Sequence, residues 1–514
     1  MKEMKKILII LIIGILAACS DFLEPKSQSE YIPKEAAALN EMLLGNAYPV
    51  ASNGKHLLDI VSLLDDDVMC TDSEGEISKT AQSNSFIALK ALFSWQPNIF
   101  KLLKDNMMEI NPWGDYYALI LGTNAALDYI DDVSGSVEEK SLVKAQALAL
   151  RAFYYFQMVN IFGESYNYNK KGLGVPLKMT SELEKRDIPR NTVEEVYNQI
   201  LEDLGEAEKL YISLPKTVQF KKDYRTSLPM VQLLKSRVYL YMEDWENAAI
   251  YAKKVIDDWD FSLTDLNALP EKSIANPYYN FISMDCTETI WVFGEISKYT
   301  NFLTTIVVID DYWKDDATIG IKFFNVSDDL YRLYVDGDLR KENYIVRSMF
   351  KDSKGERYDG DNMALGKFAI SSEREPRNGE NFAHAFRLPE AYLNLAEAAA
   401  KGGDDEIALK ALNDLRRKRF SNEGEYKDIS GISGEKLVER IRLERRLELC
   451  FEGHRWFDLK RYGMPSIVHV WKDNGTPIQS YTLSEKDPFY VIPIPDDVLD
   501  KNKNLEQNKL PNPR

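Results

Sequence analysis

The sequence has few residues of the kinds that build metal centres and disulfide frameworks. Among its 514 residues there are only four cysteines and four histidines, scattered along the chain. Cysteines so widely spaced form neither a zinc pattern nor a disulfide framework, and the scattered histidines argue against a histidine-based metal site. We interpret Cys70, Cys286 and Cys450 as buried thiols and treat Cys19 separately below.

An excess of basic residues is also missing. The chain has 64 Lys and Arg against 81 Asp and Glu, a net charge of −17. Binding to phosphate backbones needs a surface rich in Lys and Arg, so nucleic acid is not an expected partner. Hydrophobic residues make up 45% and charged residues 28% of the chain, a composition that excludes a mainly disordered protein.

Motifs for catalysis are absent as well. There is no G-x-S-x-G, H-E-x-x-H or glycine-rich phosphate motif. A hydrolase would need paired carboxylates or a nucleophile with its base, and the acidic runs 65–67 and 315–316 are the candidates. With 81 carboxylates in the chain, we interpret both runs as solvated loops. We expect no enzyme and no cofactor; the runs 336–338 and 359–362 leave a structural Ca²⁺ open, although neither fits an EF-hand loop.

One apolar run stands out, and it lies at the N-terminus. A basic start precedes the 12 apolar residues 7–18, too few for a membrane span, which needs roughly 20. The run therefore indicates a secretory signal. Leu-Ala-Ala-Cys at 16–19 is similar to a bacterial lipobox, in which the cysteine is lipidated and becomes the mature N-terminus. We expect residues 1–18 to be a lipoprotein signal peptide, Cys19 the lipid anchor and residues 19–35 a tether.

Helical periodicity dominates the regions on either side of the middle. Apolar residues follow the 3.6-residue spacing of a helix at 113–130 and most clearly at 137–162, which ends before a glycine. The ring cluster at 153–156 is predicted to be core. Asn191-Thr192 followed by two glutamates is an N-cap signal for a helix that runs to about residue 210.

Two segments repeat one plan, a pair of antiparallel helices. Residues 231–256 break near Glu243-Asp244, and residues 388–418 break at Gly402-Gly403. Ala248 and Ala408 are small residues at matching positions, where helices can approach closely. Both segments look like tetratricopeptide units. Two copies are too few for a free-standing superhelix, so we expect these helices to pack onto other structure.

The middle of the chain differs from both ends. Helical spacing fades, and the runs 289–294 and 304–309 are strand-like. The proline-rich last 50 residues predict an extended wrap. The fold class is therefore mainly α, a tetratricopeptide-like helical-pair scaffold with an irregular loop and short-strand region laid over it. The expected division is an N-terminal helical part 36–260, a variable region 261–385, and a C-terminal helical part with its tail 386–514.

Aromatic residues are dense on the loops of this middle region. Tyr299, Tyr312 and Trp313 lie in a stretch without helical spacing, and carboxylates and Lys314 stand beside the last two. Sugar rings stack their C–H faces on Tyr and Trp while their hydroxyls bond neighbouring polar groups. We predict these three rings as ligand-binding residues, although the same rings are equally consistent with burial or with a protein interface. Trp291, inside a strand-like run, is predicted to be core.

Four separated blocks resemble the SusD/RagB family of outer-membrane nutrient-binding lipoproteins. The blocks are RAFYYFQMVNIFGE at 151–164, RLPEAYLNLAEAAAKGG at 387–403, ERRLELCFEGHRWFDLKRYG at 444–463 and VIPIPDDVLDKNKNLEQN at 491–508. In the third block the sequence places arginines and glutamates in alternation, which predicts i,i+3 and i,i+4 ion pairs along one helix. These residues are Arg445, Arg446, Arg455, Glu444, Glu448 and Glu452.

The resemblance implies a function as well as a fold. Members of this family lie as lids on a TonB-dependent transporter of the SusC type, capture a glycan or sometimes a peptide at the cell surface, and are not enzymes. The implied location is the outer membrane, with the protein lipid-anchored and surface-exposed. Residues 65–94 contain only two aromatics, Phe86 and Phe93, and Trp95 is a framework position, so a starch-type aromatic arc is not expected. A peptide-binding lid is the alternative, and a lipid-anchored hydrolase a third, disfavoured hypothesis.

Overall fold

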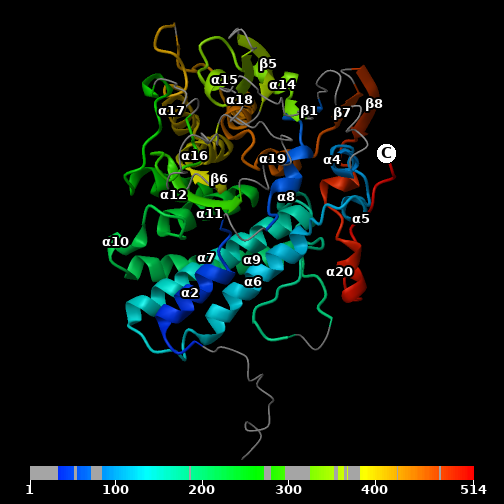
Figure 1. The fold of residues 1–514 in the computed structure, drawn as a ribbon. Helices are drawn as coiled ribbons and strands as arrows, with labels where there is room; N and C mark the ends of the chain where they lie inside the picture. The colour runs from blue at the N-terminus through cyan, green and yellow to red at the C-terminus, as the bar shows by residue number, and fades with distance from the viewer. Residues whose placement is uncertain are drawn as a thin grey trace, which may run out of the picture.

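The chain folds as a mainly helical body with small antiparallel sheets, one of them among the helices and others at the end away from α2 and α6 (Figure 1). We describe it from a computed structural model. It describes residues 33–50, 55–70, 84–183, 187–270, 279–295, 324–351, 357–363, 367, 382–424, 426–473 and 476–514. Within these residues no helix is both long enough and apolar enough to cross a membrane.

The longest helix, α7 (Val137–Phe162), organises the N-terminal half. It begins at a capping box in which the side chains of Ser136 and Glu139 bond each other's backbone N–H groups, and it ends at Gly163, as predicted. The rings at 153–156 are all buried, which confirms them as core. Around α7 pack α2 (Ala36–Asn46), α6 (Pro112–Tyr129) and α9 (Val193–Ser213).

The two predicted helix pairs are confirmed. The first is α11 (Leu228–Tyr241) with α12 (Trp245–Asp257), and the second is α16 (Leu388–Gly402) with α17 (Asp405–Arg416). Each break contains a residue in the left-handed conformation, Glu243 at φ 61° and Gly403 at φ 87°. Helix α16 packs against α12 and α17, so the two pairs form one continuous stack.

Shorter helices complete the body. Helix α18 (Gly434–Leu449) packs on α16 and α17, and α19 (Arg455–Arg461) follows it. The remaining helical segments are α4 (Asn84–Phe93), α5 (Ile99–Asp105), α8 (Tyr166–Asn169), α10 (Lys216–Gln219), α14 (Asp328–Leu333), α15 (Arg340–Asn343), α20 (Asp496–Lys501), η1 (Asp59–Leu63), η2 (Leu266–Ala268) and η4 (Pro488–Tyr490).

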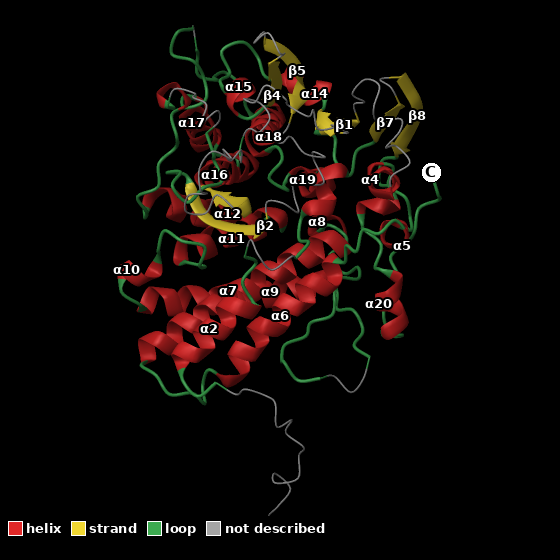
Figure 2. Cartoon of the chain, viewed as in Figure 1, coloured by secondary structure: helices red, strands yellow, loops and turns green. Residues whose placement is uncertain are grey.

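All four sheets in the described part of the chain are two-stranded and antiparallel. They pair β1 (Val68–Cys70) with β3 (Phe324–Val326), β2 (Thr289–Glu295) with β6 (Phe382–Arg387), β4 (Val346–Lys351) with β5 (Arg357–Met363), and β7 (Ile467–Asp473) with β8 (Thr476–Leu483). Figure 2 shows β2 lying against the helices, while β5, β7 and β8 lie at the end away from α2 and α6.

The first strand-like run of the middle region is confirmed as β2, and its Trp291 is fully buried with its ring edge-on to Phe153. The extended wrap expected for the last 50 residues is wrong for 467–483, which form a hairpin, and for the helical segments η4 and α20. The physical reason is the alternation of buried Ile467, His469 and Trp471 with more exposed residues, a strand pattern that outweighs the prolines following it. Beyond the hairpin the tail does run over the body, where Arg190 donates to the backbone of Glu506.

Small residues make the close contacts of the helix stack. Ala248 and Ala408 are both completely buried. Ala408 belongs to a cluster with residues of α12, α16 and α18, among them Ala252, Ala396 and Ile441. A larger side chain there has no free volume to enter, because protein interiors are close-packed.

We therefore expect Ala408→Leu to destabilise the fold by about 1–3 kcal/mol, the usual cost of overpacking. Thermal unfolding followed by circular dichroism measures this as a lower melting temperature. Lys410→Leu is the matched control, because that side chain is 76% exposed on the same helix and should leave the melting temperature nearly unchanged. Equal melting temperatures for wild type and Ala408→Leu would contradict a tight helix–helix contact at this position.

Candidate ligand-binding face

The predicted site residues lie outside the described part of the chain. Tyr299, Tyr312 and Trp313, the second strand-like run and the acidic run 315–316 all fall within 296–323, and Cys19 falls within 1–32. The structure does describe where the segment 296–323 begins and ends. It leaves from β2 after Glu295 and returns into β3 at Phe324.

Both ends of that segment are held by strand pairing. Glu295 pairs with Phe382 of β6, and Gly294 donates its backbone N–H to Pro49 at 2.8 Å. Phe324 pairs with Cys70 of β1, and the residue after β3, Ser327, bonds the backbone of Asp67 at 2.7 Å. The described residues on either side of 296–323 are thus fixed by backbone pairing.

Packed rings lie beneath the β1–β3 edge. Phe93 contacts Phe324 at a centroid distance of 5.2 Å and stacks on His469 at 4.1 Å, and Trp95 stacks on His469 at 4.1 Å. Phe93, Trp95 and His469 are almost fully buried, so they are core and not a surface for a ligand. This confirms Trp95 as a framework position.

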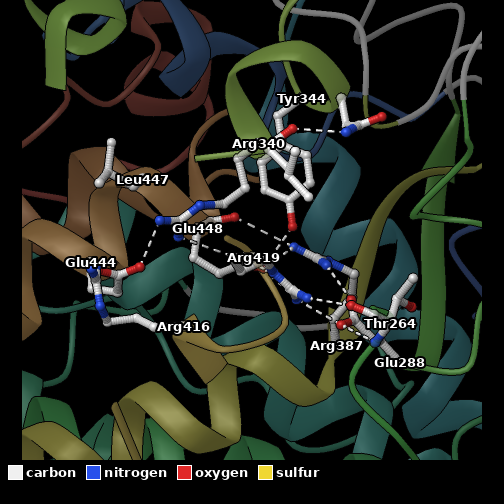
Figure 3. Close-up of polar contacts among 12 residues, drawn as sticks. Thr264, Glu288, Arg340, Tyr344, Arg387, Arg416, Arg419, Glu444, Leu447 and Glu448 are labelled. Atoms are coloured by element: carbon white, nitrogen blue, oxygen red, sulfur yellow. Dashed lines mark hydrogen bonds and ion pairs between the residues drawn. The ribbon is translucent and has the colours of Figure 1, made fainter. Parts of the chain in front are cut away.

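At the Thr289–Arg387 end of the β2–β6 pair lies the most conspicuous polar feature of the described residues, a buried ionic cluster (Figure 3). It joins the C-terminal helices to the middle region by contacts between residues far apart in sequence. We define the cluster as five cations, Arg340, Lys367, Arg387, Arg416 and Arg419, with five carboxylates, Glu288, Asp338, Glu444, Glu448 and Glu452.

Glu448 of α18 is the centre of the ionic cluster. Its carboxylate accepts from Arg419 at 2.9 and 3.0 Å, from Tyr344 at 2.9 Å and from Arg340 at 3.3 Å. Arg387 approaches the same carboxylate at 3.5 Å. None of these charged side chains has any solvent exposure, so their charges are compensated within the buried cluster, where the three arginines also pair with Glu288, Asp338, Glu444 and Glu452.

Mutual compensation keeps the cluster ionised. Burial alone would raise the pKa of Glu448, but the charges of Arg419 and Arg387 hold it far below its usual range. Burial would likewise lower the pKa of Arg419, yet Glu288 and Glu448 raise it well above its usual value. A buried charge is tolerated only when it is paired and hydrogen-bonded, and this cluster satisfies both conditions.

Lys367 fixes part of the middle region to this cluster. Its ammonium group is fully buried and bonds the carbonyl groups of Glu448 and Cys450 and the carboxylate of Glu452, at 2.5, 3.0 and 2.7 Å. Its own carbonyl accepts from Phe281 at 2.7 Å. Arg387, at the end of β6, completes the attachment through both oxygens of Glu452.

The sequence predicts that the alternating charges of 444–455 form ion pairs along one helix. This prediction is wrong. Helix α18 ends at Leu449, and Phe451 takes the left-handed conformation, so Glu452 and Arg455 lie outside it. Arg445 instead pairs with Asp458 at 2.9 Å. Only Arg440–Glu444, at 2.9 Å, is an i,i+4 pair of α18 among the described residues.

The acidic run 65–67 is not the solvated loop that was predicted. Asp65 and Asp67 are buried, and Asp66 accepts both hydrogen bonds of the Arg455 guanidinium at 2.7 and 2.8 Å. Burial alone would raise the pKa of Asp66, but the hydrogen bonds and charge of Arg455 lower it to about 2. Arg446 pairs with Asp67 at 2.7 Å. The run is therefore a docking point for α18 and α19, where Asp66 and Asp67 are paired with arginines, while burial and the neighbouring aspartates raise the pKa of Asp65.

Two further sequence interpretations concern single residues. Cys70, Cys286 and Cys450 are confirmed as buried thiols, and burial raises the pKa of Cys450 to about 11. Asp338, from a run considered for Ca²⁺, uses its carboxylate to bind Arg340 at 2.7 and 2.9 Å. No group of three or more potential metal ligands occurs among the residues with described side chains.

The sequence reasoning missed the ionic cluster, although a signal for it exists. Glu444 and Glu448 lie on the same side of α18 as Leu447 and Ile441, four residues apart, where an amphipathic helix has its apolar stripe. Charged residues at such positions need buried partners. Those partners are distant in sequence, and no local pattern identifies them.

Comparison with known proteins agrees with this architecture. Residues 287–511 match the family described as the SusD family, and residues 21–240 match a family described as starch-binding associating with outer membrane. The chain belongs to the SusD/RagB family. The two matched ranges include the whole ionic cluster and helices α2 to α11.

Several family members resemble this chain, some over most of its length and one over a shorter stretch. SusD-like protein P2 of Formosa agariphila is 25% identical over 446 residues, 80% of this chain and 82% of that protein. Starch-binding protein SusD of Bacteroides thetaiotaomicron is 32% identical over 130 residues, 24% of this chain and 20% of that protein. A solved SusD superfamily protein from Bacteroides thetaiotaomicron has a TM-score of 0.67 at 21% identity, covering 92% of this chain and 98% of its own. The SusD-like fold is therefore confirmed.

The ionic cluster yields a test of stability. Glu448→Gln removes one negative charge from the centre and leaves buried arginines without full compensation, which should cost about 3–5 kcal/mol. Denaturant unfolding measures this cost. Glu435→Gln is the control, because its carboxylate is 63% exposed and such surface pairs contribute at most about 1 kcal/mol.

The pH dependence has a defined sign. The folded-state pKa of Glu448 lies below the ordinary value of 4.5, so its contribution is complete above that pH and is lost as the pH falls further. Glu448→Gln should therefore lose less stability than wild type on acidification below pH 4.5. If Glu448→Gln unfolded at the same denaturant concentration as wild type, Glu448 would not be the centre of a stabilising cluster.

Proposed function

We propose that this SusD/RagB-family chain is a non-catalytic cell-surface lipoprotein that binds a glycan and delivers it to a TonB-dependent transporter of the SusC type. The observation that carries the proposal is the match of residues 21–240 to a family described as starch-binding and associating with outer membrane. Support also comes from relatives whose names describe sugar binding, among them a solved putative sugar binding protein from Bacteroides vulgatus with a TM-score of 0.67 at 22% identity.

The proposed ligand contacts are Tyr299, Tyr312 and Trp313. The scaffold uses its rings for packing, as at 153–156 and at Trp291, all of which are buried. The segment 296–323 carries further rings between two fixed strand ends. Beside them the sequence places carboxylates and a lysine that can bond sugar hydroxyls.

The ligand is proposed to differ from starch. A starch-type arc would draw rings from the region before the first scaffold helices, where Phe93 and Trp95 are fully buried.

A peptide-binding lid on the same kind of transporter is the alternative. Incubating the purified protein with a panel of polysaccharides and peptides separates these cases, because a glycan-binding protein retains a polysaccharide without cleaving it. Retention of peptides alone would establish the alternative, and cleavage products would establish a hydrolase.

The proposed membrane attachment rests on Cys19. With no membrane-crossing helix among the described residues, the lipobox-like Leu-Ala-Ala-Cys at 16–19 is the proposed anchor. We expect Cys19→Ala to move the protein from the membrane fraction to the soluble fraction, and Cys70→Ala, which changes a buried thiol, to leave it in the membrane. Labelled fatty acid incorporated into Cys19→Ala would refute this anchor.

The proposed ligand contact rests on Trp313. Loss of one stacking ring costs about 1–2 kcal/mol by analogy with aromatic pairs and base stacking, so Trp313→Ala should weaken glycan binding roughly tenfold. Trp313→Tyr keeps a flat ring and should retain most of the affinity. Titration calorimetry with the polysaccharide retained in the panel measures both. An intact affinity with a lowered melting temperature would instead show that Trp313 packs under its loop.

A further inference from the structure

A second, concave site is lined by residues that lie far in the sequence from the proposed ligand contacts. It encloses about 340 Å³ between α8, the turn after α19, the segment around η4 and the C-terminal tail. Small-molecule sites in proteins measure about 300–1,000 Å³, so this pocket has the size of one. All its lining residues come from 164–173, 464–491 and 507–509, and none belongs to the middle region 261–385.

The walls of the pocket are fixed by the polar contacts of the tail. Arg190 donates to Asn508 at 2.8 Å and to the carbonyl group of Leu173 at 3.0 Å. Gln507 exchanges two hydrogen bonds of 2.8 Å with the backbone of Ile494. The amide groups of Gln507 and Asn508 are thus used to hold the tail in place. A site whose walls are already ordered loses little conformational freedom when a ligand binds.

Backbone geometry also shapes the pocket. Met464 and Lys486 both line it and both take the left-handed conformation, at φ 57° and 54°. The N–H of Lys486 donates to the carbonyl group of Met464 at 2.8 Å, which joins the two residues. Residues with a side chain adopt this conformation uncommonly. Of the two residues in this conformation, Met464 is buried in the wall of the pocket, and the Lys486 side chain is 53% exposed.

The charges that remain available in the pocket are mainly positive. The carboxylate of Asp487 already accepts from Arg514 and from the backbone of Phe489. Glu164 has one oxygen engaged by Asn169 at 2.5 Å. Lys486 has only a 3.5 Å contact with the exposed Glu485, and Lys509 forms no ion pair with any described residue. The lining thus holds two lysines and two carboxylates, of which Asp487 is bound to Arg514, in a chain whose net charge is −17.

A flat apolar surface accompanies these charges. The Tyr168 side chain is 54% exposed and lines the pocket together with Leu173, Pro488 and Val491. An exposed ring in a concave site presents a face on which the C–H groups of a sugar can pack. The lysines lining the same pocket supply cations for a carboxylate. We propose that this pocket is a second saccharide site that takes an acidic sugar unit, a uronate, with Tyr168 under the ring and Lys486 and Lys509 on its carboxylate.

The inference rests on the proposed function only for the class of ligand, because the pocket shares no residue with 296–323. The probe is digalacturonic acid, compared with a neutral galactose disaccharide, in titration calorimetry with the full mature chain. We expect the acidic disaccharide to bind at least tenfold more tightly than the neutral one and its affinity to fall with added NaCl, as expected for ion pairing.

Three variants localise the binding. The double variant Lys486→Asn/Lys509→Gln removes both cations, and asparagine is chosen because it tolerates the left-handed conformation at 486. The double variant should lower the affinity for digalacturonic acid at least tenfold. Tyr168→Ala should lower it roughly tenfold. Lys503→Gln is the matched control, because its side chain is 69% exposed outside the pocket and should leave the affinity unchanged. Melting curves verify that each variant is folded.

Several outcomes would overturn the inference. They are equal binding of the acidic and neutral disaccharides, an unchanged affinity in the double lysine variant, and tighter binding of an acidic dipeptide than of the uronate. Trp313→Ala separates this inference from the proposed function. It should keep the affinity for digalacturonic acid even where it loses the polysaccharide, whereas loss of both probes in Trp313→Ala would place the uronate at the first site and remove the second.

Discussion

The shared carboxylate of Glu448 is the constraint on which the rest of this structure depends. Arg340, Arg387 and Arg419 reach it from α15, from the end of β6 and from the segment after α17, without any contact with solvent. Each charge would be costly to bury alone, and each is satisfied only when the elements carrying the others are in place. The middle region can therefore attach to the helical stack only when all the charged partners are in place. This requirement specifies one arrangement of the elements more sharply than apolar packing alone does.

This attachment divides the chain into residues that support the fold and the segment proposed to bind the ligand. The strands β2, β3 and β6 and the single residue Lys367 are held by the scaffold, and the segments that leave them can differ in length at little cost, because the entropy of closing a loop grows only slowly with its length. A fixed frame with long segments between fixed ends suits a protein whose proposed task is to hold one ligand against a partner. The same division explains why the buried rings at 153–156 and at Trp95 are unsuitable as ligand contacts, since their faces are covered by other side chains.

The sequence predicts those parts of the structure that are determined by interactions between residues close together in the chain. The bounds of α7 were predicted because its apolar spacing and its terminal Gly163 are local signals, and the helix pairs were predicted because their breaks are local too. The interpretation of 65–67 as solvated failed because Arg446 and Arg455, which neutralise those aspartates, are about 380 residues away in the chain. The helix expected through 444–455 failed at Cys450 and Phe451, where the backbone turns although the charge pattern continues. Of the candidate site, Tyr299, Tyr312 and Trp313 remain predictions from residue type and neighbours, while the pocket at Tyr168 was missed, since its walls come from three distant segments.

Charge placement connects the interior with the surface. The ionic cluster contains five cations and five carboxylates and is therefore neutral, so the net charge of −17 resides elsewhere in the chain. An acidic ligand approaching such a protein meets repulsion at long range, but at physiological salt that field is screened beyond about 8 Å. Contacts with Lys486 and Lys509 act at a few ångströms and are screened much less. A small pocket with two lysines in its wall can consequently select an anionic sugar by contact geometry, without the broad positive surface that would also attract nucleic acid.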